Sequence, residues 1–368
     1  MTTKTIRAIG AALLVAVWLG LTAFAWLKPA GEESEAERRK LEQFPELNSE
    51  TLLDASFMSD FESYTLDQFP LRDTFRQLKA LFHYNVMRQG DNNDIYIADG
   101  YAAKMEYPMS ESSLKLAVSK FNKLYDNYLK ENGSKVYMAV VPDKGYYLAE
   151  DNGYLSMDYD ALFSYFRENM DYATHVDLTD CLRIEDYYKT DTHWRQEKLL
   201  PAAQKLSEAM GVTAPKAEDF TQKLIERPFY GVYYGQAALP MEPEALYIME
   251  SELLSECTVF NYEKNVESKV YDMEKLDSRD LYDVFLSGAC SLLKIENPNA
   301  STDRELVVFR DSFGSSMIPL LVRDYKTVTV VDIRYIASDL VGNFVEFNGQ
   351  DVLFLYSTLV LNASNSLK

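Results

Sequence analysis

Histidine and cysteine are scarce in this chain of 368 residues, which has three of each. The cysteines Cys181, Cys257 and Cys290 are an odd number without close spacing, so they predict neither a disulfide framework nor a zinc site. The sequence also lacks a glycine-rich phosphate loop and a second histidine near His193, so we expect no metal and no cofactor. With 15 glycines and 12 prolines, it is neither a low-complexity nor a fibrous chain.

Basic residues are outnumbered, since 37 Lys and Arg stand against 57 Asp and Glu and give a net charge of −20. Because the phosphates of a nucleic acid would be repelled, this balance argues against a nucleic-acid partner. The chain is long enough for a sizeable core, and its length suggests about two domains. Tyrosine is abundant, with 26 residues, and exposed aromatic rings suit sugar rings, although we expect most of them in the core.

One apolar run of about 20 residues, from Ala8 to Leu27, has the length of a helix that spans a bilayer. Lys4 and Arg7 precede it, so the positive-inside rule places the N-terminus in the cytoplasm and the rest outside. A cleavable signal peptide is the alternative, supported by the small-residue pattern at Ala23 and Ala25. Because the run is longer than a typical signal sequence, we favour an uncleaved single-pass anchor in the cell membrane.

The segment after the apolar run predicts a stalk and a helical arm. Residues 31–40 are charged, and residues 48–87 have helical spacing with a break at Phe69-Pro70. We expect the apolar positions of this arm to pack against the following domain; they are Phe57, Phe61, Tyr64, Leu71, Phe75, Leu78, Leu81 and Phe82. A hairpin with Asp99-Gly100 at its turn follows within residues 94–105.

From residue 111 the pattern alternates between helices and buried strands, which predicts an α/β fold with a mainly parallel central sheet. The expected helices are 111–131, 159–170 and 196–210, and the expected strands are 135–141, 175–178, 306–309, 327–331 and 352–356. Residues 220–282 break the alternation, and short strands are expected there at 229–234 and 258–260. We therefore expect a cytoplasmic tip and anchor at 1–30, the stalk, arm and hairpin at 31–105, and a catalytic domain at 106–368 with a β-rich insertion at about 218–284.

Two short stretches carry the candidate chemistry. Asp191 and His193 are two residues apart, so in a loop the carboxylate can hold one ring nitrogen and leave the other for a serine. Ser312 follows an apolar strand and precedes Gly314, so it lies at a strand-to-helix turn where backbone amides and a helix N-terminus face an oxyanion. Taken alone, each stretch has a plainer interpretation, because a serine after Asp at a helix start is commonly an N-cap and a histidine beside Asp is commonly a surface pair.

Six motifs in one order resemble the DHHW family, which belongs with the alginate acetylation proteins in the SGNH-hydrolase-like superfamily. They are Glu37–Pro45, Asp67–Asp73, Val140–Lys144, Asp191–Trp194, Asp311–Gly314 and Val331–Tyr335. The resemblance implies an SGNH-hydrolase-like sandwich in which Asp191 orients the base, His193 is the general base and Ser312 is the nucleophile. One position departs from the family name, because Thr192 stands where the second residue of Asp-His-His-Trp would be.

Four further residues are candidates for oxyanion or substrate contacts. Gly288 matches the glycine before the nucleophile strand, although a turn glycine is the plainer interpretation. Arg334 matches an arginine of related acetylation proteins, and the alternative is a surface cation at a strand end. Lys144 follows a predicted strand at the edge where open α/β sheets bind ligands, and Trp194 adjoins the base.

These observations predict an extracytoplasmic, membrane-anchored serine esterase or O-acetyltransferase that acts on a cell-surface or secreted polysaccharide. The alternatives are a non-catalytic polysaccharide-binding or assembly scaffold on the same fold, and a lipid hydrolase near the membrane. The resemblance implies a polytopic membrane acyltransferase as a partner. Transfer and hydrolysis share one acyl-enzyme, so the residues alone do not separate them.

Overall fold

The computed structural model describes residues 2–34 and 36–368 and divides into two compact units. The first unit ends at Asn92 and also includes Gly235–Pro240, whereas the second comprises Asn93–Tyr234 and Met241–Lys368. The expected hairpin forms from β3 (Ile95–Ala98) and β4 (Tyr101–Lys104) and lies in the second unit rather than with the helical arm. The division at residues 30 and 105 remains a prediction.

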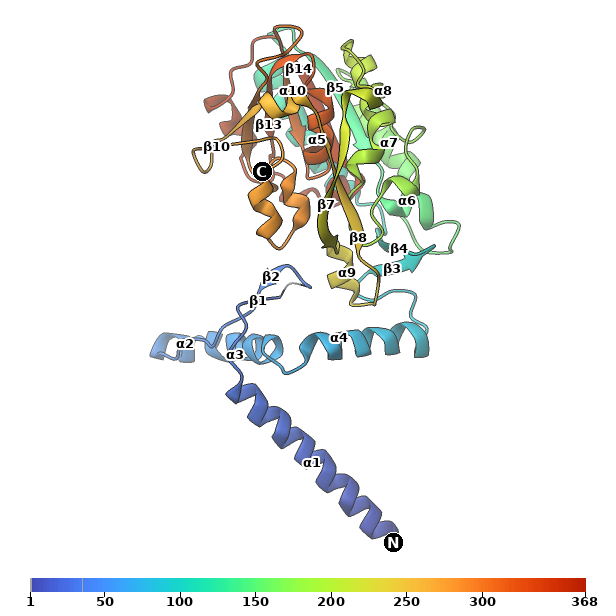
Figure 1. Ribbon diagram of the computed structural model, residues 1–368, viewed down its shortest axis with the longest axis vertical. Helices are drawn as coiled ribbons and strands as arrows, with labels where there is room; N and C mark the ends of the chain where they lie inside the picture. Colours follow the sequence, from blue (N-terminus) through green and yellow to red (C-terminus); the bar gives the residue numbers. More distant parts are fainter. Residues whose placement is uncertain (1, 35) are drawn as a thin grey trace. The chain divides into compact units, whose positions relative to one another are not determined.

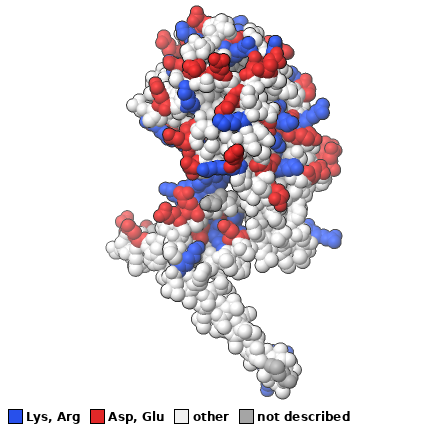
Figure 2. All heavy atoms as spheres, viewed as in Figure 1, with Lys and Arg blue, Asp and Glu red and all other residues white. Residues whose placement is uncertain are grey.

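The first unit is mainly helical. It contains α1 (Thr3–Leu27), a short pair β1 (Glu33–Ser34) and β2 (Arg39–Lys40), α2 (Ser49–Leu53), α3 (Ser56–Asp67) and α4 (Arg72–Leu81), which continues as a π-helical turn, η1 (Phe82–Val86) (Figure 1). The predicted break at Phe69-Pro70 falls between α3 and α4. Helix α1 is long and apolar enough to cross a membrane, and none of its described residues is buried. Figure 2 shows it without charged side chains except near its N-terminal end.

The second unit is built on an eight-stranded sheet in the order β10-β9-β11-β13-β12-β14-β5-β6. The run from β13 to β6 is parallel, and β11, β9 and β10 add an antiparallel edge. The bounds are β5 (Lys135–Val141), β6 (Thr174–His175), β9 (Thr258–Asn261), β10 (Val266–Ser268), β11 (Leu292–Glu296), β12 (Arg304–Arg310), β13 (Tyr325–Val331) and β14 (Asp351–Ser357). The predicted α/β class with a mainly parallel sheet is confirmed.

Helices cover both faces of this sheet, which is why its central strands are apolar at nearly every position. Helix α8 (Leu200–Met210) packs on one face against side chains such as Val308 and Leu355. Helices α5 (Glu111–Leu124), continued by the π-helical η2 (Tyr125–Leu129), and α7 (Tyr159–Asn169) pack on the other face against side chains such as Val307 and Phe354. Successive strand residues therefore contribute to two separate cores.

The remaining elements connect these layers. They are α6 (Lys144–Leu148), the paired strands β7 (Thr221–Phe229) and β8 (Glu244–Glu250), α9 (Val232–Ala237), α10 (Glu252–Glu256), α11 (Gly314–Met317), α12 (Thr358–Asn362) and the 3-10 turns η3 (Ile184–Asp186), η4 (Gln196–Lys198), η5 (Ala217–Asp219), η6 (Met273–Asp277), η7 (Leu281–Val284), η8 (Ile318–Leu321), η9 (Ser338–Asn343) and η10 (Ser364–Ser366).

Two sequence predictions about these elements were wrong in detail. Residues 229–234 are not one strand, because Phe229 ends β7 and a helix begins at Val232. The predicted strand 175–178 is shorter, since the Asp177 side chain accepts hydrogen bonds from the amide and hydroxyl of Thr179 and turns the chain. The predicted insertion does contain short strands, since β7 and β8 pair with each other and β9 and β10 extend the central sheet.

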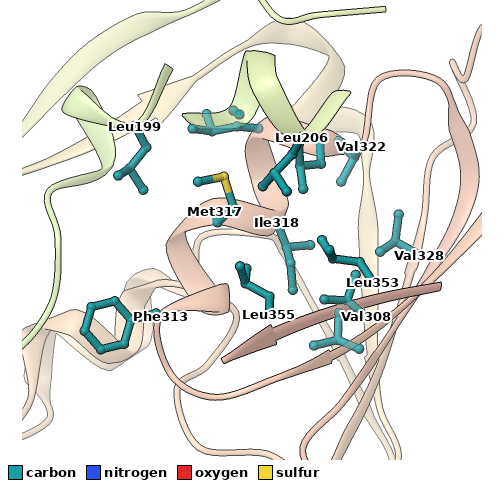
Figure 3. Close-up of a cluster of buried hydrophobic side chains, with 14 of the residues drawn as sticks. Leu199, Leu206, Val308, Phe313, Met317, Ile318, Val322, Val328, Leu353 and Leu355 are labelled. Carbon is teal, nitrogen blue, oxygen red and sulfur yellow. The ribbon is translucent and has the colours of Figure 1, made fainter. Parts of the chain in front are cut away.

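Residues of three family motifs, together with Ser357, meet at the carboxyl edge of the parallel strands. Asp143 follows β5, Asp311 and Ser312 follow β12, Asp332 follows β13, and Ser357 ends β14. Behind this edge, Phe313 and Met317 place α11 between the strand residue Leu355 and the α8 segment at Leu199 and Leu206 (Figure 3). The turn that bears Ser312 therefore rests on a packed apolar layer.

Leu355→Ala should lower the free energy of unfolding by about 2–5 kcal/mol, because it leaves a cavity in that layer. Urea unfolding of the detergent-solubilised full chain, followed by circular dichroism, measures the change. The control Leu340→Ala removes a side chain that is 49% exposed and should change stability by less than about 0.5 kcal/mol. Equal effects of the two substitutions would contradict the packing described.

Candidate active site

Asp191, His193 and Ser312 form one hydrogen-bonded chain. His193 Nδ1 lies 2.6 Å from Asp191 Oδ1, and His193 Nε2 lies 2.7 Å from Ser312 Oγ. Because the carboxylate only accepts, we assign the proton to Nδ1, which leaves Nε2 to accept the hydroxyl proton. Asp191 is fully buried and His193 is 7% exposed, whereas Ser312 is half-buried. The chain thus leads from a buried carboxylate to a serine that is only partly buried.

The loop that carries Asp191 and His193 is closed by backbone hydrogen bonds. The amide of Tyr188 donates to the carbonyl of His193 at 3.0 Å, and the amide of Arg195 donates to that of Asp186 at 2.7 Å. Asp191 Oδ1 also accepts from the amide of His193 at 3.0 Å, and Oδ2 accepts from the amide of Val232 at 2.8 Å. With both oxygens engaged, the carboxylate has a fixed orientation toward the imidazole.

The backbone of Gly231 packs directly against the backbone of this loop. No pattern in the sequence indicated this contact. A Cβ at Gly231 would lie 2.2 Å from the Cα and backbone nitrogen of Asp191. Its amide donates to Thr190 Oγ1 at 2.9 Å, while the amide and hydroxyl of Thr190 donate to Glu244 Oε2 at 2.8 and 3.0 Å. Only glycine fits this close approach of two backbone segments.

The imidazole of His193 stacks on the ring of Tyr282, with centroids 3.9 Å apart and planes 6° from parallel. The Tyr282 hydroxyl lies 2.7 Å from Ser316 Oγ. Burial raises the pKa of Tyr282 well above its ordinary value, so this ring stays a neutral phenol. Tyr282 belongs to the inserted segment, and no local pattern connects that segment to the base.

The Ser312 turn is held by the preceding aspartate. Asp311 Oδ1 accepts from the amide of Phe313 at 3.0 Å, and Oδ2 accepts from the amide and hydroxyl of Ser357 at 2.7 and 2.6 Å. Within residues 2–34 and 36–368 the amide of Ser312 donates to no acceptor, so it can serve an oxyanion. The predicted helix dipole contributes little, because α11 has four residues before a 3-10 turn.

The structure agrees with the plainer interpretation of Gly288 as a turn glycine. Its amide already donates to the carbonyl of Phe285 at 3.2 Å, and its φ of +75° is the left-handed conformation of a turn glycine. A Cβ there would also clash with the carboxylate of Asp283. The carbonyl of Gly288 instead accepts from the buried Arg310 at 3.2 Å.

Trp194 was a candidate for substrate contact, and the structure excludes that role. Its side chain is fully buried, and Nε1 donates to the carbonyl of Phe313 at 3.0 Å and to Ser316 Oγ at 2.9 Å. The indole therefore ties the loop of the base directly to the turn of the serine. The adjacent Thr192 accepts a hydrogen bond from the hydroxyl of Tyr233 at 3.1 Å.

Lys144 lies behind the Asp191 loop, and its side chain is not turned to solvent. It is 2% exposed, and Nζ donates to the carbonyls of Tyr188 at 2.9 Å and Lys189 at 3.2 Å. Burial lowers its pKa to about 7, although the charges of Asp191, Glu244 and Asp143 oppose that shift. These contacts make Lys144 a support of the loop, and its predicted role in substrate contact has no observation in its favour.

Arg334 is paired, not a free surface cation. Its Nε and one terminal nitrogen donate to Asp332 at 2.9 and 2.6 Å, and Asp332 also lies 3.5 Å from the buried Arg310. Its side chain keeps 18% of its surface exposed. A substrate contact by Arg334 stays a prediction.

The resemblance to the DHHW family is confirmed, because the family model described as "DHHW protein" matches residues 155–331. A DHHW family protein from Eubacterium siraeum has the same fold, with 21% identity, a TM-score of 0.60, and coverage of 75% of this chain and 94% of that one. Bacillus cereus PatB1, solved with a sulfonyl adduct, gives 18% identity, a TM-score of 0.58, and coverage of 73% and 97%. The search of curated proteins found no match.

The depressed pKa of Lys144 predicts a pH dependence of stability. Its folded pKa of about 7 lies below the unfolded value of 10.5, so between these values the unfolded chain binds one proton more than the folded chain. Stability then rises with pH by up to about 1.4 kcal/mol per unit from this group, and below pH 7 the group adds no slope.

Lys144→Met should remove that part of the slope between pH 7 and pH 9, as measured by urea unfolding at several pH values. The control Lys130→Met changes a lysine at the surface and should leave the slope as in the unsubstituted chain. Identical slopes in all three proteins would show that Lys144 does not titrate in this range.

Proposed function

Because residues 155–331 match the DHHW family, we propose that this protein is an extracytoplasmic, membrane-anchored, SGNH-like serine esterase or O-acetyltransferase. We further propose that its acceptor or substrate is a cell-surface or secreted polysaccharide. The observation that carries the proposal is the chain of hydrogen bonds from Asp191 through His193 to Ser312, at 2.6 and 2.7 Å. Distances of this size are those of an activated nucleophile with an oriented base.

In the first step Ser312 Oγ attacks the carbonyl carbon of an acyl donor while His193 Nε2 takes the hydroxyl proton. The imidazolium that forms faces the carboxylate of Asp191, and the oxyanion accepts from the amide of Ser312. Collapse breaks the bond to the leaving group, which takes the proton from His193 and leaves an acyl ester on Ser312. Because Asp191 is buried, little water screens its attraction to the imidazolium. The carboxylate therefore stabilises the positive charge on His193.

In the second step His193 removes a proton from a sugar hydroxyl or from water, and that oxygen attacks the acyl ester. The tetrahedral intermediate expels Ser312, which recovers its proton from His193. A sugar hydroxyl gives transfer, and water gives hydrolysis. The two outcomes use the same residues, so the identity of the second nucleophile is set by what binds beside the half-buried Ser312.

Membrane attachment is supported by the composition of α1. Its 25 residues are long and apolar enough to cross a bilayer, and Lys4 and Arg7 stand at its N-terminal end. This arrangement favours a cytoplasmic N-terminus with both the stalk and the catalytic unit outside.

A sulfonyl fluoride provides the direct test, since sulfonyl transfer requires an activated nucleophile. Phenylmethylsulfonyl fluoride should modify Ser312 in the full chain in detergent, as read by peptide mass spectrometry. Ser312→Ala should lose the label and lose at least about 10³-fold in the rate of hydrolysis of a soluble acetyl ester. An oligosaccharide acceptor added to the assay should collect the acetyl group if transfer is the reaction.

The control Ser112→Ala removes an exposed serine on α5 and should keep both the label and the rate. Absence of label on Ser312, together with equal ester hydrolysis in all three proteins, would refute the catalytic proposal. A glycan pull-down that persists in that case would instead favour the polysaccharide-binding scaffold.

Gly231→Ala tests the geometry of the acid. The added Cβ must displace Asp191, and displacement of a catalytic group by about 1 Å costs about 10²-fold in rate. We therefore expect about that loss in kcat/KM for the acetyl ester. The control Gly20→Ala adds a methyl group on α1, where no other part of the described chain lies within 4 Å and the backbone is helical, and should retain the rate; a loss as large as that of Gly231→Ala would contradict this explanation.

A further inference from the structure

Two motifs of the first unit take no part in the proposed chemistry, yet they bind each other. Arg39 of the motif Glu37–Pro45 donates to both oxygens of Asp67 in the motif Asp67–Asp73, at 2.7 and 2.5 Å. Glu37 in turn lies 2.6 Å from Arg72 and 3.1 Å from Arg76. We refer to Glu37, Arg39, Asp67, Arg72 and Arg76 as the clasp.

The clasp orients α4. Arg72 and Arg76 turn toward Glu37 and keep only 18% and 21% of their side-chain surface exposed. Arg76 also donates to the carbonyl of Gly235, within the same unit, at 2.9 Å. The charged side of α4 is therefore its inner side.

The outer side of α4 and its π-helical extension is an apolar stripe at spacings of three and four residues. Its side chains are 44–64% exposed, and they are Leu71, Phe75, Leu78, Phe82 and Val86. An amphipathic helix of a soluble protein places its apolar side inward, and this helix does the reverse. The stripe is thus exposed on its own unit, and packing of Leu71, Phe75, Leu78 and Phe82 against the following domain stays a prediction.

The same unit contains the apolar helix α1, and hydrogen bonds join the segment after its C-terminal end to the helical arm. Gly31, four residues after α1, exchanges two hydrogen bonds with the side chain of Gln68, at 2.8 and 2.9 Å. A cavity of about 180 Å³ lies between α1 and α3, and its walls include Trp18 and Trp26 of α1 and Phe61 of α3. The arm is thus fastened where α1 ends, and α4 begins four residues after Gln68.

We propose that the apolar stripe of Leu71, Phe75, Leu78, Phe82 and Val86 lies in the outer interface of the lipid bilayer that α1 spans. An exposed apolar face beside the end of a spanning helix meets the zone where headgroups give way to acyl chains, and burial there removes it from water. The paired charges of the clasp remain on the water side. Lys79, at the border of the stripe, can extend its ammonium toward the headgroups.

This placement goes beyond the proposed activity and is independent of Ser312, since it depends only on α1 as the span. It gives the first unit two contacts with the membrane, one across the bilayer and one along its surface. The clasp sets the second contact, because Glu37 pairs with both Arg72 and Arg76 and holds them on the inner side of α4.

Site-directed spin labelling of the full chain in lipid nanodiscs tests the proposal. Labels at Leu78→Cys and at the neighbouring, inner position Gln77→Cys are compared in a Cys181→Ser background, with Lys130→Cys as a water-exposed reference in the second unit. Cys257 and Cys290 are buried and should not react with the label in the folded chain.

The readout is the collision rate of each label with oxygen, which concentrates in lipid, and with a water-soluble nickel chelate. We expect the ratio of oxygen to nickel collisions to be several-fold higher at position 78 than at positions 77 and 130. A ratio at position 78 equal to that at position 130 would overturn the proposal. Spin–spin broadening at position 78 that disappears on dilution with unlabelled chain would also overturn it, because a second copy would then cover the stripe. Failure of the full chain to float with lipid vesicles would overturn it as well.

Glu37→Gln then tests the clasp. Removing its charge should lower the collision ratio at position 78 toward that at position 77, because α4 is free to turn, while Glu62→Gln, an exposed residue on α3, should leave it unchanged. An unchanged ratio in Glu37→Gln would show that the clasp does not set the orientation.

Discussion

The buried carboxylate of Asp311 is the constraint on which the candidate site depends. A buried charge must be satisfied by hydrogen bonds, and Asp311 meets this need with Phe313 on its own turn and Ser357 on the neighbouring strand β14. Those bonds fasten the turn of Ser312 to the sheet. Trp194 then fastens the loop of His193 to the same turn, so nucleophile and base share one rigid frame.

Charged side chains of the first unit also need partners, but there the pairing leaves apolar side chains on the surface. Its charged side chains find partners inward, in the clasp between Arg39, Asp67, Glu37, Arg72 and Arg76. Apolar side chains are left outside as a consequence. In the second unit apolar side chains fill two cores on either face of the sheet, which is the ordinary solution in water. The difference follows from the solvent that each surface is proposed to face.

Much of the fold and part of the site could be predicted from local pattern. The buried strands at 135–141 and 306–309, the break at Pro70 and the hairpin turn at Asp99-Gly100 each follow from the chemistry of neighbouring residues. Asp191 and His193 were candidates because they stand two positions apart, with only Thr192 between them. Gly231, Tyr282 and Glu244 were not, because each reaches the loop of the base from the inserted segment. Trp194 was expected near the substrate and is buried instead, because motif order does not record which polar atoms already have partners.

The sequence by itself determined which segments are apolar, with what period, and in which order the motifs stand along the chain. Periodicity follows from backbone geometry, so it can be read without the fold. Only the tertiary structure decided that His193 and Ser312, 119 residues apart, lie at hydrogen-bond distance, and that the apolar side of α4 faces outward. Both depend on how separate elements pack, since a pattern along one helix or strand records that a face is apolar but not what that face meets.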